Sequence, residues 1–351
     1  MTIRVAVWGT GGIGSNAIAA ISQRPDMELV GVWVHSSERI GIDAGVIAGG
    51  APTGVLACGD AAEVLAARPD CICYAASGPQ GDAIAVPDYV RFLEAGIDVV
   101  TVSTAALVYP PAYDAANREL LTAAALRGGA TLYASGIEPG FAADQFVLTM
   151  LTMSKTVRSI RIQELFCYDA YPVEFVMREV FGFGHALDHR PIMAHSGAQA
   201  ATWSAPVRMI ADAMGAELES VRETYERALT PRRLEVACGV IEADTVGAVR
   251  FETIGVIGGR DAIVVEHVNR MAMDLAPDWP SAAQDGTYRV DIDGDPEMHC
   301  DFRVGGNGTG SIDGMVATTM RIVNAIPAVH AARPGLVSSL DLPLTLPRHA
   351  F

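Results

Sequence analysis

Three glycines with a defined spacing are the first residues whose types could do chemistry. Gly9, Gly11 and Gly14 form G-x-G-x-x-G between the apolar run I-R-V-A-V-W and the helix-like segment S-N-A-I-A-A-I-S. In such a strand–loop–helix unit the glycines permit a tight turn, a close approach of a pyrophosphate and close helix packing. The pyrophosphate lies at the helix N-terminus, where free amides and the helix dipole favour an anion. The expected dinucleotide contacts are Gly9, Thr10, Gly11, Gly12, Ile13 and Gly14.

The end of the second expected strand bears on which dinucleotide is bound. An acidic residue there would hold the ribose hydroxyls of NAD, but this chain has His35, Ser36, Ser37, Glu38 and Arg39 in that order. Small hydroxyls followed by an arginine can accommodate a 2′-phosphate, so the pattern favours NADP. Two alternatives stay open: NAD is also used, or Arg39 is a solvated residue in the first turn of a helix.

Two further short segments follow apolar strands and could line a nicotinamide crevice. They are Ala76, Ser77 and Gly78 after one strand, and Ser103 and Thr104 after the next. In an open parallel sheet the carboxyl ends of the strands border the ligand. Each segment alone could equally be an ordinary loop start, but together they indicate a binding edge.

The composition of the chain excludes several classes of function. A net charge of −16 over 351 residues argues against nucleic-acid binding, which needs a basic face. The N-terminus enters a strand directly and the apolar stretches are short, so we expect neither a secretory signal nor a membrane span. The six cysteines form no C-x-x-C, which favours buried free thiols in the cytoplasm and no metal site. Lys155 is the only lysine, so a Schiff-base or lysine-base mechanism would depend on that residue alone.

The elements that position these residues alternate between strand and helix. Apolar runs at 3–8, 27–35, 54–57, 70–76, 98–103 and 130–134 alternate with helical patterns at 15–22, at 38–48, from Asp60 onward, at 84–95 and at 112–127. Strands without strict alternation are buried on both faces, so the pattern predicts a doubly wound parallel sheet of the Rossmann type. The fold class is α/β, and this dinucleotide-binding domain should cover residues 1–140.

After about residue 155 the pattern changes to period two. Segments such as R-F-E-T-I-G-V-I and M-H-C-D-F-R-V alternate apolar and polar residues, as in an antiparallel sheet with one buried face. We expect an α+β domain for the substrate and dimerisation at 141–311, with a largely antiparallel sheet. His267 and His299 lie in alternating strands and fit that sheet better than a catalytic site. Residues 312–351 are expected to form a C-terminal helix and tail that return to the first domain.

Several motifs together resemble one known family. V-W-G-T-G-G-I-G, W-V-H-S-S-E-R-I-G-I-D-A-G, G-I-E-P-G-F-A-A-D, F-G-F-G, A-P-D-W-P and V-N-A-I-P-A-V occur in order along nearly the whole chain. They resemble the dihydrodipicolinate reductase-like family that contains 2,4-diaminopentanoate dehydrogenase and the NAD(P)-dependent amine dehydrogenases. The E-x-H-H and K-x-D-A-P-S-G-T motifs of true dihydrodipicolinate reductases are not in the sequence. The resemblance implies a homodimer and hydride transfer between a nicotinamide and a carbon that bears nitrogen. It also leads us to expect a cofactor contact from Asn324, in V-N-A-I-P-A-V.

The chain departs from this family at its acidic catalytic position. The amine dehydrogenases carry E-E-L-x-Y-P where this chain has A-A-L-V-Y-P, so that Ala105 and Ala106 replace the acidic pair before Tyr109. Glu138, in S-G-I-E-P-G-F, could supply the acid, or it could simply be a carboxylate stabilised at a helix start.

Other residues remain candidates for the site. His185 follows F-G-F-G, on a segment that borders the substrate in the family, although a satisfied or solvated histidine fits equally well. Together with Glu138 and His185, Thr104 is an expected catalytic residue. The hydroxyl of Tyr109 could also take part, but its apolar surroundings favour a packing role. Phe181, Phe183 and Trp203 could roof a hydrophobic substrate pocket, although such residues are more often part of a core.

Three functional hypotheses follow. The first is an amine dehydrogenase-like enzyme that acts on a small hydrophobic amine or carbonyl compound. The second is an imine or ketone reductase that uses no free ammonia, because the acidic pair is missing. The third is a nucleotide-binding family member without catalytic activity.

Overall fold

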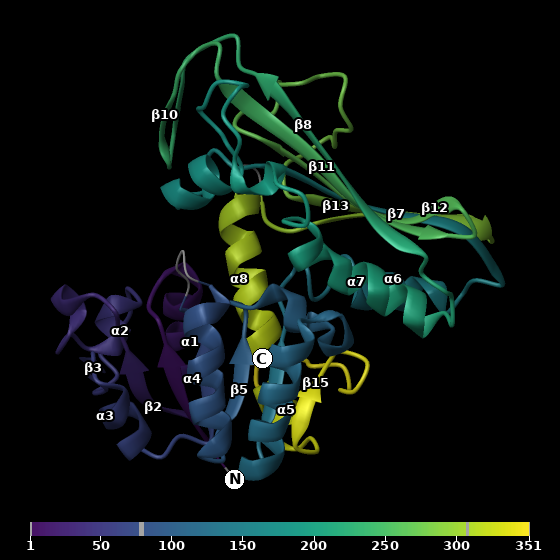
Figure 1. Ribbon diagram of the computed structural model, residues 1–351. Coiled ribbons are helices and arrows are strands. Elements are labelled where there is room, and N and C mark those ends of the chain that lie inside the picture. Colours follow the sequence, from purple (N-terminus) through teal and green to yellow (C-terminus); the bar gives the residue numbers. More distant parts are fainter. Residues whose placement is uncertain (1, 77–80, 307–308, 351) are drawn as a thin grey trace. The chain divides into compact units, whose positions relative to one another are not determined.

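The computed structural model describes residues 2–76, 81–306 and 309–350. The chain forms two compact units (Figure 1). The first contains Met1–Gly140 and Met315–Phe351, and the second contains Phe141–Gly314. The boundary between the two units falls within helix α8, Gly310–Val323.

A parallel sheet of seven strands forms the centre of the first unit. Its strand order is β15-β6-β5-β4-β1-β2-β3, and all six neighbouring pairs are parallel. The strands are β1 Ile3–Trp8, β2 Met27–Trp33, β3 Ala57–Cys58, β4 Cys71–Tyr74, β5 Asp98–Thr101, β6 Thr131–Ala134 and β15 Gly335–Val337. Every residue of β4, β5 and β6 is buried, which explains why these segments do not alternate. The strand order reverses at β1 and β4, and in such sheets the carboxyl ends at the reversal border the ligand.

Short and long helices connect these strands. They are α1 Gly12–Ser22, α2 Ala44–Ile47, α3 Ala61–Ala66, α4 Asp82–Glu94, α5 Ala115–Gly128 and α9 Ile326–His330, with 3-10 turns η1 Ser37–Arg39, η2 Ala105–Val108 and η3 Pro110–Ala112. Ile18 and Ile21 of α1 and Ile322 and Ile326 near the C-terminus pack in one core cluster with the strands. This unit therefore confirms the expected Rossmann-type sheet.

The continuous helix expected at 38–48 is wrong. The segment contains η1, then an irregular stretch, and then the four-residue helix α2. Gly41 has a φ of +80°, a left-handed conformation that ends a right-handed helix. The Asp43 side chain accepts hydrogen bonds from Gly45 N at 2.7 Å and Gly54 N at 2.7 Å, which fixes the turn in a new direction. Local turn chemistry thus overrides the helical pattern.

A mixed sheet of six strands forms the second unit. Its order is β14-β13-β7-β12-β11-β8, and only β7 and β12 pair in parallel. The strands are β7 Thr156–Cys167, β8 Ser220–Leu229, β11 Val246–Ile257, β12 Arg260–Arg270, β13 Thr287–Asp295 and β14 Met298–Arg303, and a separate ribbon contains β9 Leu234–Val236 and β10 Gly239–Ile241. The expected second domain with a largely antiparallel sheet is therefore confirmed.

Two helices cover one face of this second sheet. They are α6 Gln145–Leu151 and α7 Ala200–Ala213 (Figure 1). Val207 and Ile210 of α7 pack on Ile162, Val265 and other apolar residues of the strands. A short π-helical turn, η4 Val176–Val180, and a 3-10 turn, η5 Ile192–Ala194, lie in the long connection before α7. Of the described helices, none is both long and apolar enough to cross a membrane.

Candidate active site

The first glycine of the loop allows two strand ends to approach each other. Gly9 has a φ of +96°, and a Cβ built on it would lie 2.8 Å from the backbone nitrogen of Ala76. Because Ala76 follows β4, the loop after β1 and the loop after β4 meet at the sheet's carboxyl edge. A side chain at position 9 would force these loops apart. Ser77 and Gly78, which were expected to continue this edge, lie outside the described residues.

The other two glycines shape the start of α1. A Cβ on Gly14 would lie 1.9 Å from the carbonyl oxygen of Gly9, so only glycine lets the helix pack this closely on the loop. A Cβ on Gly11 would meet no described atom within 4 Å, so this side of the loop is open. No side chain caps the helix N-terminus at Gly11. The loop therefore has the shape and the free amide donors to bind a pyrophosphate.

The remaining residues of the loop tie it to its surroundings. The carbonyl oxygen of Thr10 accepts a hydrogen bond from Ser15 Oγ at 3.3 Å, and that of Ile13 accepts one from Thr319 Oγ1 at 3.5 Å. Gly12 faces the Met315 side chain, whose sulfur would lie 3.2 Å from a Cβ at position 12. These contacts hold the loop in one shape before any ligand binds.

Arg39 reaches from η1 to the glycine loop. Its Nη1 atom donates to the carbonyl oxygen of Thr10 at 2.5 Å and to Thr10 Oγ1 at 2.9 Å. His35, Ser36 and Ser37 are exposed between the end of β2 and Arg39. The structure therefore places a guanidinium beside the loop, preceded in the chain by two exposed serines, and a guanidinium is suited to bind a phosphate.

A hydrogen-bond network surrounds the end of β5. Thr104 is 4% exposed, and its Oγ1 atom donates to Asp82 Oδ1 at 3.1 Å, while the Tyr113 hydroxyl donates to Asp82 Oδ2 at 2.7 Å. The Tyr89 hydroxyl lies 3.3 Å from the same Thr104 Oγ1. Ser103 Oγ is buried and has no hydrogen-bond partner in the described part of the chain. Ser103 thus presents an unused polar atom at the edge where a nicotinamide is expected.

This network contains a carboxylate that the sequence reading missed. Thr104 directly precedes Ala105 and Ala106, which form the start of η2 and contribute no acid. Asp82 is the first residue of α4, which begins two residues before the helix expected from the sequence. Its carboxylate therefore contacts the residue next to the missing acidic pair. The two residues are 22 positions apart, and no local signal connects them.

Glu138 lies in a tightly held loop after β6. Ser135 Oγ and Arg321 Nη2 both donate to the carbonyl oxygen of Gly140, at 3.1 and 3.0 Å. Gly140 has a φ of +125°, and a Cβ there would lie 2.2 Å from Gly136 N. The Glu138 side chain is half-buried, and its peptide bond to the following proline is cis. The structure thus holds a half-buried carboxylate on a fixed loop after β6.

His185 lies in the second unit, in a cluster with His189 and Glu179. The two imidazole rings stack with centroids 3.8 Å apart and an interplanar angle of 18°, and His185 Nε2 lies 3.4 Å from Glu179 Oε1. One possible ligand atom from each residue lies within 4.8 Å of the others. However, imidazole lone pairs lie in the ring plane, and nearly parallel rings do not direct them to one ion. This cluster would have to rearrange to hold a metal.

The structure corrects the expected role of Asn324. Its Oδ1 accepts a hydrogen bond at 3.1 Å from Arg24, a residue just beyond the end of α1. The glycine loop lies at the other end of this helix, whose 11 residues span about 16 Å. Asn324 therefore stabilises the packing at the far end of α1 and is too distant to bind the pyrophosphate.

The three aromatic residues for which the sequence left both a pocket and a core role open are part of a core. Phe181 and Phe183 are 8% and 0% exposed and belong to a buried cluster within the second unit. Trp203 packs on Phe251, with ring centroids 5.0 Å apart. These contacts assign a packing role to all three residues.

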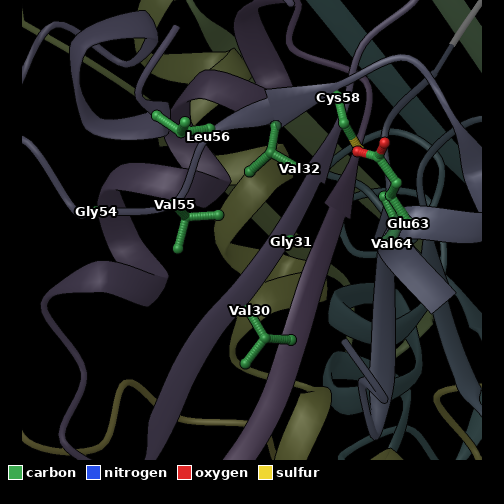
Figure 2. Close-up of a pocket in the computed structure, with 9 residues that line it drawn as sticks. All are labelled: Val30, Gly31, Val32, Gly54, Val55, Leu56, Cys58, Glu63 and Val64. Atoms are coloured by element: carbon green, nitrogen blue, oxygen red, sulfur yellow. The ribbon is translucent and has the colours of Figure 1, made fainter. Parts of the chain in front are cut away.

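A cavity at the β2–β3 edge of the first sheet is separate from the glycine loop. It has a volume of about 300 Å³, and its lining comes from β2, the segment 54–58 and α3 (Figure 2). Figure 2 shows Cys58 next to the carboxylate of Glu63. Burial and the Glu63 charge raise the pKa of the Cys58 thiol above its ordinary value, which favours the protonated form. None of the residues expected to bind the cofactor lines this cavity.

Comparisons with known proteins agree with the geometry of the loop and with the fold. Residues 141–349 match the 2,4-diaminopentanoate dehydrogenase C-terminal domain, and residues 3–74 match the dihydrodipicolinate reductase N-terminus. An amine dehydrogenase from Streptomyces virginiae is 37% identical over 352 residues, which cover 97% of this chain and 96% of that protein. A 2,4-diaminopentanoate dehydrogenase from Acetoanaerobium sticklandii is 23% identical over 73% of this chain and 70% of its own length.

A solved structure extends this agreement to the whole fold. The amine dehydrogenase from Mycobacterium smegmatis superposes with a TM-score of 0.82 at 20% identity, covering 99% of this chain and 97% of that chain. The chain therefore belongs to the family of 2,4-diaminopentanoate dehydrogenases and amine dehydrogenases, and it is a nicotinamide-dinucleotide-dependent oxidoreductase.

Proposed function

We propose that the protein is an NADP(H)-preferring amine dehydrogenase. It would transfer a hydride between the nicotinamide and the carbon of a small hydrophobic amine, or of the imine formed from its carbonyl partner. The observation that carries this proposal is the 37% identity to an amine dehydrogenase over nearly the whole chain. The glycine loop, whose open side faces away from packed atoms at Gly11, supports the cofactor assignment.

The preference for NADP rests on Arg39. Its contacts with Thr10 hold the guanidinium beside the loop, where it would pair with a 2′-phosphate. Arg39→Ala should weaken NADPH binding by roughly 10- to 100-fold, the effect of losing a charge-assisted pair of ~1.5–3 kcal/mol, and leave NADH binding nearly unchanged. Arg127→Ala, at an exposed pair with Glu94, is the matched control. An equal effect on both cofactors would contradict the preference.

The chain's own residues would then orient and protonate the substrate. A nicotinamide cofactor held by the glycine loop would supply the hydride-transfer chemistry. Glu138 would protonate the departing oxygen during imine formation and stabilise positive charge on nitrogen, and Ser103 Oγ would orient the cofactor's amide. Thr104 and Asp82 would hold the end of β5 in place. His185 stays a candidate for the wall of the substrate site.

The test of this function is turnover with and without ammonia. NADPH oxidation by a panel of aldehydes and ketones should require ammonia, and the reverse reaction should convert primary amines. Glu138→Gln should reduce the rate by roughly 100-fold or more, the size of a lost general acid. Glu119→Gln, an exposed carboxylate on α5, serves as the control. Full activity of Glu138→Gln would remove Glu138 from the mechanism.

A second candidate function is favoured by Ala105 and Ala106. The half-buried pair provides no carboxylate in η2, so the chain could instead reduce a preformed imine or a ketone. Turnover without ammonia would support that function. NADPH binding with no turnover of any compound would support a catalytically inactive member.

We also propose that the protein is a cytoplasmic homodimer that acts on small molecules and binds no nucleic acid. The family resemblance and the acidic net charge of −16 support these assignments. Sedimentation at micromolar concentration would distinguish a dimer from a monomer.

A further inference from the structure

One row of side chains crosses the second sheet from edge to edge. Backbone register places one residue of each strand in this row, on the face covered by α6 and α7. In order from β14 to β8 the row contains Phe302, Tyr288, Glu164, His267, Phe251 and Tyr225. Five of the six residues carry rings. Glu164 is the one carboxylate, and it lies near the middle of the sheet.

All the hydrogen bonds described for this carboxylate come from neutral groups. Glu164 Oε1 accepts from the Tyr168 hydroxyl at 2.6 Å and from Asn269 Nδ2 at 3.1 Å, and Oε2 accepts from the Tyr288 hydroxyl at 3.3 Å. Glu164 is 7% exposed. None of the ion pairs in the described ranges involves it, so its negative charge has no cationic partner there. A buried carboxylate without such a partner is costly unless a proton or a bound cation neutralises it.

Four aromatic residues form a contiguous group that reaches this carboxylate through the Tyr168 and Tyr288 hydroxyls. The ring of Phe166 lies 5.0 Å from that of Tyr288 and 6.3 Å from that of Tyr168. Tyr171 is half-buried, and its ring lies 5.6 Å from that of Tyr168. The faces of aromatic rings attract cations, and clusters of aromatic residues are a common way to bind organic ammonium groups. We call these four aromatic residues together with Glu164 the aromatic box.

One polar atom beside the aromatic box has no hydrogen-bond partner within the described part of the chain. Asn269 is fully buried, and its Oδ1 has no hydrogen-bond partner within the described part of the chain. Its Nδ2 donates to Glu164, and turning the amide over would place two oxygens together, so this orientation is fixed. The unused acceptor Asn269 Oδ1 therefore lies beside a carboxylate whose charge has no cationic partner among the described ion pairs. A ligand that complements it must donate hydrogen bonds and carry positive charge.

We propose that the aromatic box binds the primary ammonium group of an organic cation. The ligand's N–H groups would donate to Glu164 and to Asn269 Oδ1, and its positive charge would lie against the aromatic faces. All the residues involved belong to the second unit, so the site is defined without reference to the cofactor loop. The inference rests on the proposed function in one respect: it assigns a residue that recognises the charged form of an amine substrate.

Direct binding tests this inference without turnover. The full chain is titrated calorimetrically with n-butylammonium chloride and with n-butanol, a neutral molecule of similar size. The ammonium should bind at least tenfold more tightly than the alcohol, and Glu164→Gln should remove most of that difference. Glu252→Gln is the matched control, because it removes a carboxylate from the opposite face of the same sheet. It should leave binding of the ammonium unchanged.

Two results would overturn the inference. Equal binding of ammonium and alcohol, or no measurable binding of either, would show that a water molecule or a proton completes the box. Unchanged ammonium binding by Glu164→Gln would place the cation elsewhere. If Glu164→Gln does not fold, Tyr171→Leu tests the same site, because it leaves the carboxylate in place and should still weaken ammonium binding several-fold.

The outcome is separable from that of the proposed function. Ammonium binding that depends on Glu164, in a protein with no amine turnover, would support the box and contradict the enzyme assignment. Amine turnover with an unchanged KM in Glu164→Gln would support the enzyme assignment and contradict the aromatic box.

Discussion

The two faces of the second sheet bury a carboxylate each, in opposite ways. Glu266 is 0% exposed, and it is bound by Arg161 Nη1 at 2.5 Å, Arg250 Nε at 2.7 Å and Gln163 Nε2 at 2.8 Å. Glu164 lies on the neighbouring strand, and its described hydrogen bonds come from two tyrosines and an asparagine. The charge of Glu266 is neutralised by arginines of the same chain. Glu164 receives hydrogen bonds from neutral groups, which do not neutralise its charge.

This difference separates a structural carboxylate from a candidate binding group. Two guanidiniums stabilise the charge of Glu266, so nothing further is needed at that site. Burial raises the pKa of Glu164, and the hydrogen bonds from Tyr168, Asn269 and Tyr288 oppose that rise only in part. A buried group with such a shift, next to an unsatisfied acceptor, is a functional candidate.

The largest expected change in the free energy of unfolding comes from removing the paired carboxylate of Glu266. Glu266→Gln takes the fully buried carboxylate from Arg161 and Arg250, which keep their contacts with Glu252, and we expect it to lower the free energy of unfolding by about 3 kcal/mol. Both arginines remain partly exposed, so water limits the loss. Urea denaturation measures the change, and an unaltered midpoint would show that the pairing adds no stability.

Glu164→Gln should act in the opposite direction on stability. It replaces a buried group that is costly to ionise with a neutral one of the same shape. At pH 8 we therefore expect a gain of about 1 kcal/mol in the free energy of unfolding. The same urea experiment checks this value. A loss of stability as large as that of Glu266→Gln would remove the distinction between the two faces.

The pH dependence of stability should reveal the same carboxylate. Because the pKa of Glu164 is raised in the folded state, the native protein holds a proton that the unfolded chain has released. Stability should therefore fall, by up to ~1.4 kcal/mol per pH unit, as pH rises from about 4.5 through the raised pKa. His267, next in the row, has its pKa lowered to about 3 by burial and acts in the opposite sense below pH 6.5.

The difference in the free energy of unfolding between wild type and Glu164→Gln separates the titration of Glu164 from that of His267 and of the tyrosines. It also separates it from the titration of Asp285, whose negative charge raises the pKa of Glu164. That difference should grow with pH across the window above 4.5 and then become constant. A difference independent of pH would mean that Glu164 ionises alike in the folded and unfolded states.

The smallest expected effect comes from one hydrogen bond in the box. Tyr168→Phe keeps the ring and removes the 2.6 Å bond to Glu164, so we expect a loss of about 1 kcal/mol in the binding free energy of n-butylammonium. Calorimetry would check it, with Tyr74→Phe as the control, because that variant removes a tyrosine hydroxyl bonded to Asp88 in the first unit. A larger effect than that of Glu164→Gln would make the hydroxyl, and not the carboxylate, the main contact.

Sequence reasoning was most successful where the signal is local. The period of apolar residues predicted the parallel sheet and the second, largely antiparallel one. G-x-G-x-x-G predicted a tight turn at Gly9 and close helix packing at Gly14, and the structure shows that a Cβ at either position would collide with backbone atoms. The helix expected at 38–48 failed because Gly41 and Asp43 turn the chain. Asn324 was misplaced because a motif does not show which end of a neighbouring helix it contacts.

The sequence by itself determined the fold class and the glycine loop, because hydrophobic period and glycine spacing act over a few residues. Only the tertiary structure decided which carboxylates acquire partners. Asp82 meets Thr104 across 22 positions, and Glu164 meets Asn269 across 105. Whether a buried charge meets a guanidinium or a tyrosine depends on strand register, which brings together residues that are remote in the chain.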